Sequence, residues 1–168
     1  TVTASGGATC TPVPATANSC TVMGLANGTA YTFSVVAANA AGNGPAGTSS
    51  SVTPFTVPGA PTAVSAAPGN AQATVSWAAP ADNGSPITGY TVTASNGATC
   101  TTSGTTCVVG GLANGTAYTF SVVATNAAGP GPAGTSPSVT PYTVPDAPTA
   151  VTAVPGNAQA TVNWAAPA

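Results

Sequence analysis

The sequence predicts an all-β protein made of tandem two-sheet sandwiches, and three observations support this fold class. A fourteen-residue stretch, Gly111–Ala124, also occurs as Gly24–Ala37, 87 positions earlier (111 − 24 = 87). In both copies an Asn-Gly turn precedes residues that alternate in polarity, which is the period of a strand. Clusters of Gly, Pro and Asn separate the remaining apolar runs at intervals that suit short strands.

The repeated stretch predicts a tight turn that leads into a core strand. Tyr118 and Phe120 are the largest side chains on one face of that strand, so we expect this face to be buried. A turn followed by such a tyrosine is the arrangement of a tyrosine corner. The residues predicted to form the turn and the corner are Leu25, Asn27, Gly28 and Tyr31 in the first copy and Leu112, Asn114, Gly115 and Tyr118 in the second.

Residues 1–54 are predicted to form a partial module that contains no counterpart of the first two strands. Thr1–Ala4 has the pattern of a strand and matches Thr91–Ala94, and a second strand follows the turn in Gly24–Ala37. We expect a loop at Asn39–Gly47 and a short last strand at Ser49–Pro54. The next segment, Phe55–Pro61, has two prolines and one glycine and predicts a short, stiff linker.

Residues 58–141 are predicted to form one complete module of about seven strands. Three expected strands precede the repeated stretch, at Thr62–Ala67, Ala73–Trp77 and Ile87–Ser95, with turn-forming residues between them. After the stretch we expect a loop at Ala127–Gly134 and a closing strand at Ser136–Pro141. The large side chains expected in the core of this module are Trp77, Tyr90 and Phe120.

Residues 145–168 repeat the first two strands of that module and stop before the third. Trp164 matches Trp77 (164 − 77 = 87), so the pattern places it in a core as well. Two explanations account for the partial modules. In the first, this sequence is one segment of a longer tandem array of modules. In the second, the C-terminal strands of one chain complete the N-terminal part of the next chain.

At these residues the chain resembles tandem fibronectin type III modules of the bacterial type. The matching features are the prolines of Pro58–Pro61, Trp77, Tyr90, the Leu112–Tyr118 turn and the Asn126–Gly131 loop. The resemblance implies immunoglobulin-like, seven-stranded Greek-key β-sandwiches. It also implies a spacer or accessory unit of an extracellular enzyme, or a part of a surface or fibre protein. An integrin-binding Arg-Gly-Asp loop is not implied, because the chain has no Arg.

The four cysteines fall as one pair in each copy, Cys10 with Cys20 and Cys100 with Cys107. The loop between them differs in length while both cysteines are kept, which favours a local disulfide in each module. A metal site is the alternative, but two cysteines without any His do not complete a zinc shell. Disulfides imply an oxidising, extracellular or cell-surface location.

The composition argues against catalysis, nucleic-acid binding and metal binding. The chain has no Lys, Arg, His or Glu, and its acidic residues are Asp82 and Asp146. We therefore expect no enzyme activity, no cofactor, no nucleic-acid partner and no membrane insertion. The two carboxylates are far apart in sequence, so they read as turn residues rather than as a calcium site. The nearly uncharged surface favours association of the chain with itself.

Glycans are a second possible partner. Asn27, Asn83 and Asn114 each begin an Asn-Gly-Ser/Thr triplet, the pattern of an N-glycan acceptor. The turn alone accounts for Asn27 and Asn114. The sequence does not decide whether any of the three carries a sugar.

The function hypothesis from sequence is a non-catalytic structural repeat of an extracellular filament, sheath or adhesive fibre that assembles head-to-tail. The alternative is a spacer or carbohydrate-binding module of a secreted polysaccharide-degrading enzyme, with Phe55 and Tyr142 as the exposed aromatic candidates. A third reading, an adhesin tip, would use loops such as Ala127–Gly134 for contact.

Overall fold

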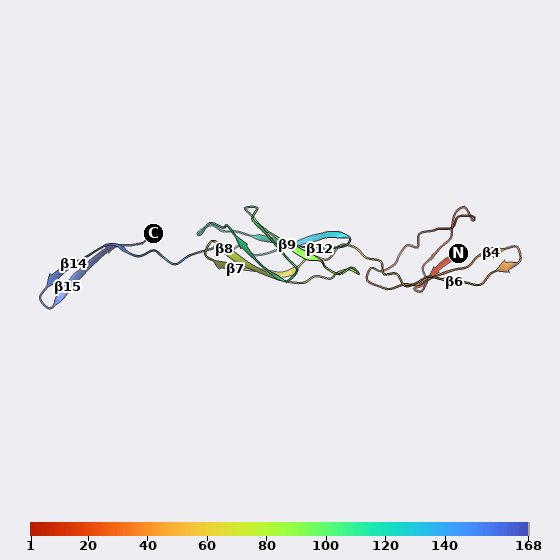
Figure 1. The fold of residues 1–168 in the computed structure, drawn as a ribbon, viewed down its shortest axis with the longest axis horizontal. Coiled ribbons are helices and arrows are strands. Elements are labelled where there is room, and N and C mark those ends of the chain that lie inside the picture. The colour runs from red at the N-terminus through yellow and green to blue at the C-terminus, as the bar shows by residue number, and fades with distance from the viewer. Residues whose placement is uncertain (168) are drawn as a thin grey trace.

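The computed structural model describes residues 1–167, and Ala168 lies outside the described part. Figure 1 shows three bodies in line: an N-terminal region, a central sandwich and a C-terminal hairpin, with the two ends of the chain at opposite sides. Residues 1–167 form strands, turns and loops without a helix, so they contain none long and apolar enough to cross a membrane.

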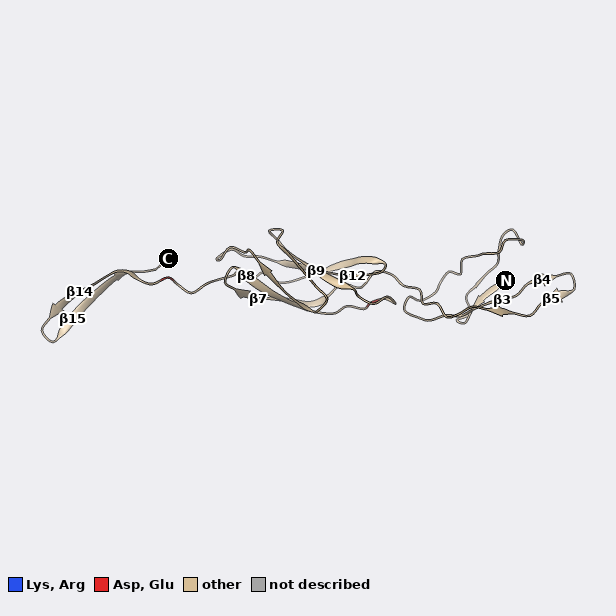
Figure 2. Ribbon diagram, in the orientation of Figure 1, with Lys and Arg blue, Asp and Glu red and all other residues tan. Residues whose placement is uncertain are grey.

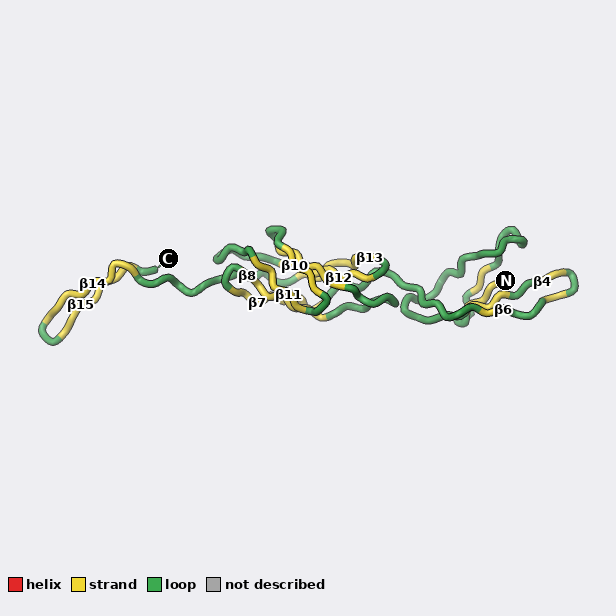
Figure 3. Tube along the Cα trace, viewed as in Figure 1, coloured by secondary structure: helices red, strands yellow, loops and turns green. Residues whose placement is uncertain are grey.

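The central module has seven strands in two sheets, which confirms the predicted all-β sandwich. One sheet has the order β10-β9-β12-β13 and the other has the order β11-β8-β7. Figure 3 shows that most of the strand content of the chain lies here. The strands are β7 (Thr62–Gly69), β8 (Gln72–Ala78), β9 (Gly89–Ala94), β10 (Thr99–Thr102), β11 (Thr106–Gly110), β12 (Phe120–Asn126) and β13 (Gly129–Thr135).

The core of the central module follows from the alternation along its strands. Every second residue of β12, beginning with Phe120, is buried between the sheets. Trp77 on β8 packs against Tyr90 on β9, with ring centroids 5.2 Å apart and planes tilted by 57°. Val75 and Val109 are fully buried from the opposite sheet. Apolar burial of this kind is the main stabilising contribution to such a sandwich.

The expectation of a loop at Ala127–Gly134 is wrong, because β13 occupies most of that segment. Its glycines and prolines read as loop-forming residues, but the backbone pairs with β12 along the edge of the sheet. An edge strand tolerates proline, which lacks a donor, since one side of the strand is unpaired. The expected closing strand at Ser136–Pro141 is reduced to a single bridge between Val139 and Tyr118.

The N-terminal region forms one four-stranded sheet of order β2-β1-β3-β6 and a small β4–β5 ribbon. The expected loop at Asn39–Gly47 is therefore wrong in part, since short strands form there. The expected strand at Ser49–Pro54 is reduced to a bridge between Val52 and Tyr31. The strands are β1 (Val2–Ala4), β2 (Thr9–Cys10), β3 (Phe33–Val35), β4 (Ala38–Asn39), β5 (Gly42–Asn43) and β6 (Gly47–Thr48).

The C-terminal hairpin pairs β14 (Thr149–Gly156) with β15 (Gln159–Ala165). Its register repeats that of β7 and β8, including the irregularity after the first pair. Unlike β7 and β8, this hairpin packs on no second sheet among residues 1–167, and all of its residues are exposed. Trp164 is consequently 61% exposed, in contrast to the core position that its repeat register predicts.

Candidate functional site: the joint between modules

Both predicted tyrosine corners form the same hydrogen bond. The Tyr118 hydroxyl accepts from the backbone N–H of Ala113 at 3.0 Å, and the Tyr31 hydroxyl accepts from that of Ala26 at 3.0 Å. Each bond closes the turn that precedes the strand. The corners differ in burial, since Tyr118 is buried and Tyr31 is only partly buried. Leu112 and Leu25, one in each turn, differ in the same way.

The turn asparagines have different roles in the two copies. Asn114 joins its turn to the β7–β8 turn: its side-chain oxygen accepts from Ala71 N–H at 2.9 Å, and its amide donates to the Asn70 side chain at 2.8 Å. The second of these bonds engages the amide nitrogen to which a glycan would be attached. Asn27 is exposed, and residues 1–54 contain no counterpart of Asn70.

The Gly28 turn of the first region contacts the β8–β9 loop of the central module. A Cβ built on Gly84 would lie 2.6 Å from Gly28 N and 2.7 Å from the carbonyl oxygen of Pro54. Gly28 N–H itself donates to that carbonyl at 2.9 Å. Because no side chain fits between the two backbones, Gly84 is required for this close approach. This contact is a defined joint between the two modules, and it is not predicted by the sequence alone.

The linker after Pro54 is held along the same loop by three hydrogen bonds. Thr56 N–H donates to the Asn83 carbonyl at 3.2 Å, and the Asn83 side-chain amide donates to the Val57 carbonyl at 2.8 Å. Gly59 N–H donates to the Ala81 carbonyl at 2.9 Å. The linker is therefore a bonded part of the joint rather than a free tether. The amide of Asn83, like that of Asn114, is engaged by the protein.

Asn126 closes the joint from the end of β12. Asn126 is buried, with an exposed fraction of 5%. The amide nitrogen lies within hydrogen-bond distance of the carbonyls of Thr56 at 2.8 Å, Asp82 at 3.0 Å and Ser85 at 3.3 Å. A buried amide with several partners fixes the segments that it joins. In the sequence Asn126 is only the first residue of the Asn126–Gly131 loop that carries the family resemblance, and its role in the joint is not predicted.

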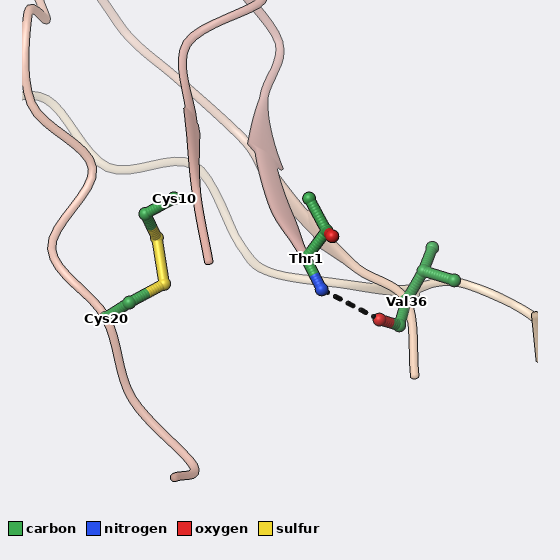
Figure 4. Close-up of a disulfide and its surroundings, with 4 residues drawn as sticks. All are labelled: Thr1, Cys10, Cys20 and Val36. Carbon is green, nitrogen blue, oxygen red and sulfur yellow. Dashed lines mark hydrogen bonds between the residues drawn. A yellow bond between two sulfur atoms is a disulfide. The ribbon is translucent and has the colours of Figure 1, made fainter. Parts of the chain in front are cut away.

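The structure pairs the cysteines as Cys10–Cys20 and Cys100–Cys107, with Cα atoms 6.1 and 6.3 Å apart. The second pair links β10 to β11 and therefore joins the two sheets of the central module. Figure 4 shows the first pair beside the N-terminus, where the amine of Thr1 donates to the Val36 carbonyl at 3.1 Å. Cys20 lies in a segment, residues 19–23, that forms no strand.

Charge is almost absent from the described surface, as Figure 2 shows. Asp82 accepts a hydrogen bond from Gly84 N–H at 3.0 Å, which is the geometry of a turn residue, and Asp146 lies in the second linker. Within residues 1–167 no three His, Cys, Asp or Glu side chains come together as a metal site would require. In the described part of the chain, the fold brings together backbone contacts, apolar faces and turns.

Two packed antiparallel sheets with a tyrosine corner are the features of an immunoglobulin-like β-sandwich protein. The family model of the fibronectin type III domain matches residues 1–53 and residues 59–141. The chain therefore belongs to the fibronectin type III family.

Comparison with known proteins gives relatives in both sequence and structure. Chitinase A1 of Niallia circulans is 41% identical over 124 residues, which cover 68% of this chain and 18% of that protein. The chain thus corresponds to a small part of the chitinase. Titin domains A168–A170 share the fold with a TM-score of 0.51 at 24% identity, covering 68% of this chain and 41% of theirs. The FN1–FN3 domains of chicken CNTN1 match at 22% identity with a TM-score of 0.45, covering 86% of this chain and 55% of theirs.

Proposed function

We propose that this chain is a non-catalytic structural array, in which modules are held end to end at a fixed spacing in an extracellular filament, sheath or adhesive fibre. The observation that carries this proposal is the joint formed by Gly28, Pro54 and Gly84. A joint made of backbone contacts and linker hydrogen bonds restricts bending between neighbours. Restricted bending is what a rod or a fibre requires and a flexible tether lacks.

The residue inventory supports a structural role over a catalytic one. The chain offers no His, Lys, Arg or Glu as general base, acid or oxyanion clamp. Its polar groups at the joint, such as Asn83 and Asn126, are engaged by backbone carbonyls. Side chains held in this way position segments of the chain and are not available to activate a substrate.

An extracellular setting is supported by the two disulfides, because disulfides persist in oxidising compartments. The nearly uncharged surface supports contact between copies, since it provides little electrostatic repulsion. Head-to-tail contacts that do not close on themselves produce fibres. The proposed partner is therefore a further copy of the same kind of module.

A second candidate function rests on the likeness to Chitinase A1. In this reading the modules are spacers, or carbohydrate-binding accessory units, within an enzyme that degrades a polysaccharide. Phe55 and Tyr142 are 50% and 64% exposed and occupy the same position one repeat apart (142 − 55 = 87). Exposed aromatic rings at a regular interval are suitable for stacking on sugars.

Electron microscopy of native, unreduced material, with antibodies against residues 58–141, separates the two candidates. The filament proposal expects the antibody to decorate long uniform fibres at a regular axial interval. Decoration of dispersed particles with a larger globular domain would overturn it and favour the enzyme spacer. In that case, pelleting with insoluble chitin compares the wild type with a Phe55→Ala, Tyr142→Ala variant, and loss of binding in the variant supports a carbohydrate-binding role.

A further inference from the structure

The outer face of the β10-β9-β12-β13 sheet is lined with hydroxyl side chains. Every second residue of β9 is buried in the core, so Thr91 and Thr93 face away from it. The strand register then places four hydroxyls in one row across the sheet, from Thr99 through Thr93 and Ser121 to Thr135. Each hydroxyl both donates and accepts hydrogen bonds. The sheet therefore presents a regular array of donors and acceptors on this face.

The same row of hydroxyls forms in the first region. There it runs from Thr9 through Thr3 and Ser34 to Thr48. Its members are the counterparts of the central row, at offsets of 90 (93 − 3 = 90) and 87 (121 − 34 = 87). The row is therefore a property of the repeated strands and of their pairing, and it forms with or without a second sheet behind it.

Beside this row the central module has an open hollow of about 420 Å³. Sites for small ligands commonly have volumes of about 300–1,000 Å³. Gly89 lies in the hollow, opposite Thr125 on β12, and it leaves the middle of the sheet without a side chain at this point. The hydroxyl residues that line the hollow are Thr88, Thr91, Thr101, Thr102, Ser103 and Thr125.

Hydrogen bonds hold two parts of this lining in place. The Thr88 hydroxyl donates to the Thr125 carbonyl at 3.0 Å, which ties the start of β9 to β12. The Thr102 hydroxyl accepts from the N–H of Gly104 at 3.0 Å, which fixes the turn after β10. The hollow is therefore already formed in the folded module, and a ligand need not order its walls.

The chemistry of the lining determines which ligand is complementary. In the described part of the chain neither Asp82 nor Asp146 lines the hollow, and the chain has no Lys or Arg, so an ionic ligand would find no partner of opposite charge. Thr91 and Thr101 are exposed and lie opposite each other. Sugar hydroxyls also donate and accept, so they can pair with these threonines without leaving an unmatched polar group.

We propose that this face of the central module binds a neutral polysaccharide, with one sugar unit seated over Gly89 between Thr91 and Thr101. The site is open and hydrated, and we expect a dissociation constant of about 1 mM. This inference goes beyond the structural array and holds for a fibre and for an enzyme spacer alike. It shares a ligand class with the second candidate function but uses a different surface, because Phe55 and Tyr142 do not line the hollow.

The test is a nuclear magnetic resonance titration of the 168-residue chain. The probes are two neutral oligosaccharides, chitohexaose and cellohexaose, with an oligogalacturonate as the anionic comparison. We expect at least one neutral probe, at millimolar concentration, to shift the backbone amide signals of Thr91, Thr101 and Thr125. The oligogalacturonate should leave these signals in place.

The Gly89→Val variant fills the hollow. A Cβ at Gly89 would lie 3.4 Å from the Thr102 carbonyl oxygen, at contact distance, so the fold should remain and circular dichroism should not change. We expect sugar binding to be weaker by about tenfold or more. The matched control is Gly110→Val on β11, in the other sheet, where the added side chain enters open space.

A second variant removes hydroxyls without filling the hollow. Thr91→Val combined with Thr101→Val keeps the shape of both side chains, and we expect binding to be weaker by about tenfold. The matched control is Thr74→Val combined with Thr106→Val, since these two exposed threonines lie on β8 and β11 of the other sheet.

The possible outcomes are distinct. Shifts around the hollow that both hollow variants weaken, and that both controls leave unchanged, would support the site. The absence of shifts with both neutral probes would overturn it, as would equal binding of the oligogalacturonate. Shifts centred on Phe55 and Tyr142 would assign sugar binding to the linkers instead. Shifts of the hollow that appear on concentrating the protein without sugar would show that a second copy covers this face, and would also overturn the proposal.

Discussion

The first region and the central module contain the same fourteen residues in different surroundings. In the central module Phe120 and Val122 are buried to 1% and 0% exposure, whereas the identical Phe33 is partly buried and Val35 is 50% exposed. The local turn and its tyrosine hydrogen bond form in both places. Local structure therefore follows from the repeated sequence, but burial follows from the β7–β8 hairpin, which residues 1–54 do not contain.

This difference separates two contributions that are usually combined in one module. Turns and short ladders are determined by residues close in sequence, such as Asn-Gly and the alternating strand. The core requires a second sheet, which comes from a segment about 50 residues away along the chain. The following predictions sharpen this contrast by changing matched residues in the two regions. All use Trp164→Phe as the background, so that Trp77 alone reports unfolding of the central module.

The largest expected effect is at the shared phenylalanine. Phe120→Ala should lower the free energy of unfolding of the central module by about 3–5 kcal/mol, because it leaves a cavity in a closed core. Phe33→Ala should leave the Trp77 transition unchanged within about 0.5 kcal/mol, because Phe33 lies outside that core. Urea unfolding followed by Trp77 emission measures both. Equal losses would mean that the two regions unfold as one unit.

The second-largest loss of unfolding free energy is expected when the disulfides are removed. Replacing Cys100 and Cys107 with Ala should lower the free energy of unfolding of the central module by about 2–3 kcal/mol, since the loop that they close restricts the unfolded chain. The same double replacement at Cys10 and Cys20 should not move the Trp77 transition. The measurement is urea unfolding with and without reductant. A change of similar size in both variants would show that the first pair also stabilises the central module.

A smaller difference in the free energy of unfolding is expected between the two tyrosine corners. Tyr118→Phe removes the acceptor for Ala113 N–H and should cost about 1 kcal/mol, since the donor is partly buried. Tyr31→Phe removes a bond of the same length at an exposed site and should leave the Trp77 transition in place. Thermal melting of the two variants compares them directly. A stabilised Tyr118→Phe protein would contradict a structural role for the corner.

The joint is expected to affect shape more than stability. Gly84→Val should disturb the contact with Gly28 and Pro54, whereas Gly97→Val places a side chain in open space at a similar φ, +88° against +93°. Both variants pay the same backbone strain. Small-angle X-ray scattering should show a change in overall dimensions for Gly84→Val alone. The joint would not control the shape if the two profiles match.

The fold could be predicted from the sequence because its signals are local. Alternation from Phe120 to Ala124 indicated a strand and its buried face, and the 87-residue repeat indicated matching modules. The strand β13 could not be predicted, because the run from Gly129 to Gly134 is rich in residues that usually form loops. Those glycines serve a tertiary purpose, allowing the edge strand to lie against Pro58 and Pro61.

The joint between the modules could not be predicted from the sequence, for a similar reason. Gly28 and Gly84 are 56 positions apart (84 − 28 = 56), and each has a sufficient local explanation as a turn residue. Asn126 likewise reads as a loop residue until the linker and the β8–β9 loop are brought to it. Contacts between modules depend on where separate turns meet, and a single sequence carries no periodicity for that.

Amide hydrogen exchange of the repeated stretch tests the central contrast most directly. Peptides that extend to Thr125 or to Ala38 distinguish the two copies, while the shared residues give nearly equal intrinsic exchange rates. In dilute protein we expect strong protection from Phe120 to Ala124 and rapid exchange from Phe33 to Ala37. The reason is that a second sheet encloses Phe120–Ala124 and does not enclose Phe33–Ala37. Equal protection of the two segments in monomeric protein would contradict the account, since burial would then follow from the repeated sequence without the hairpin.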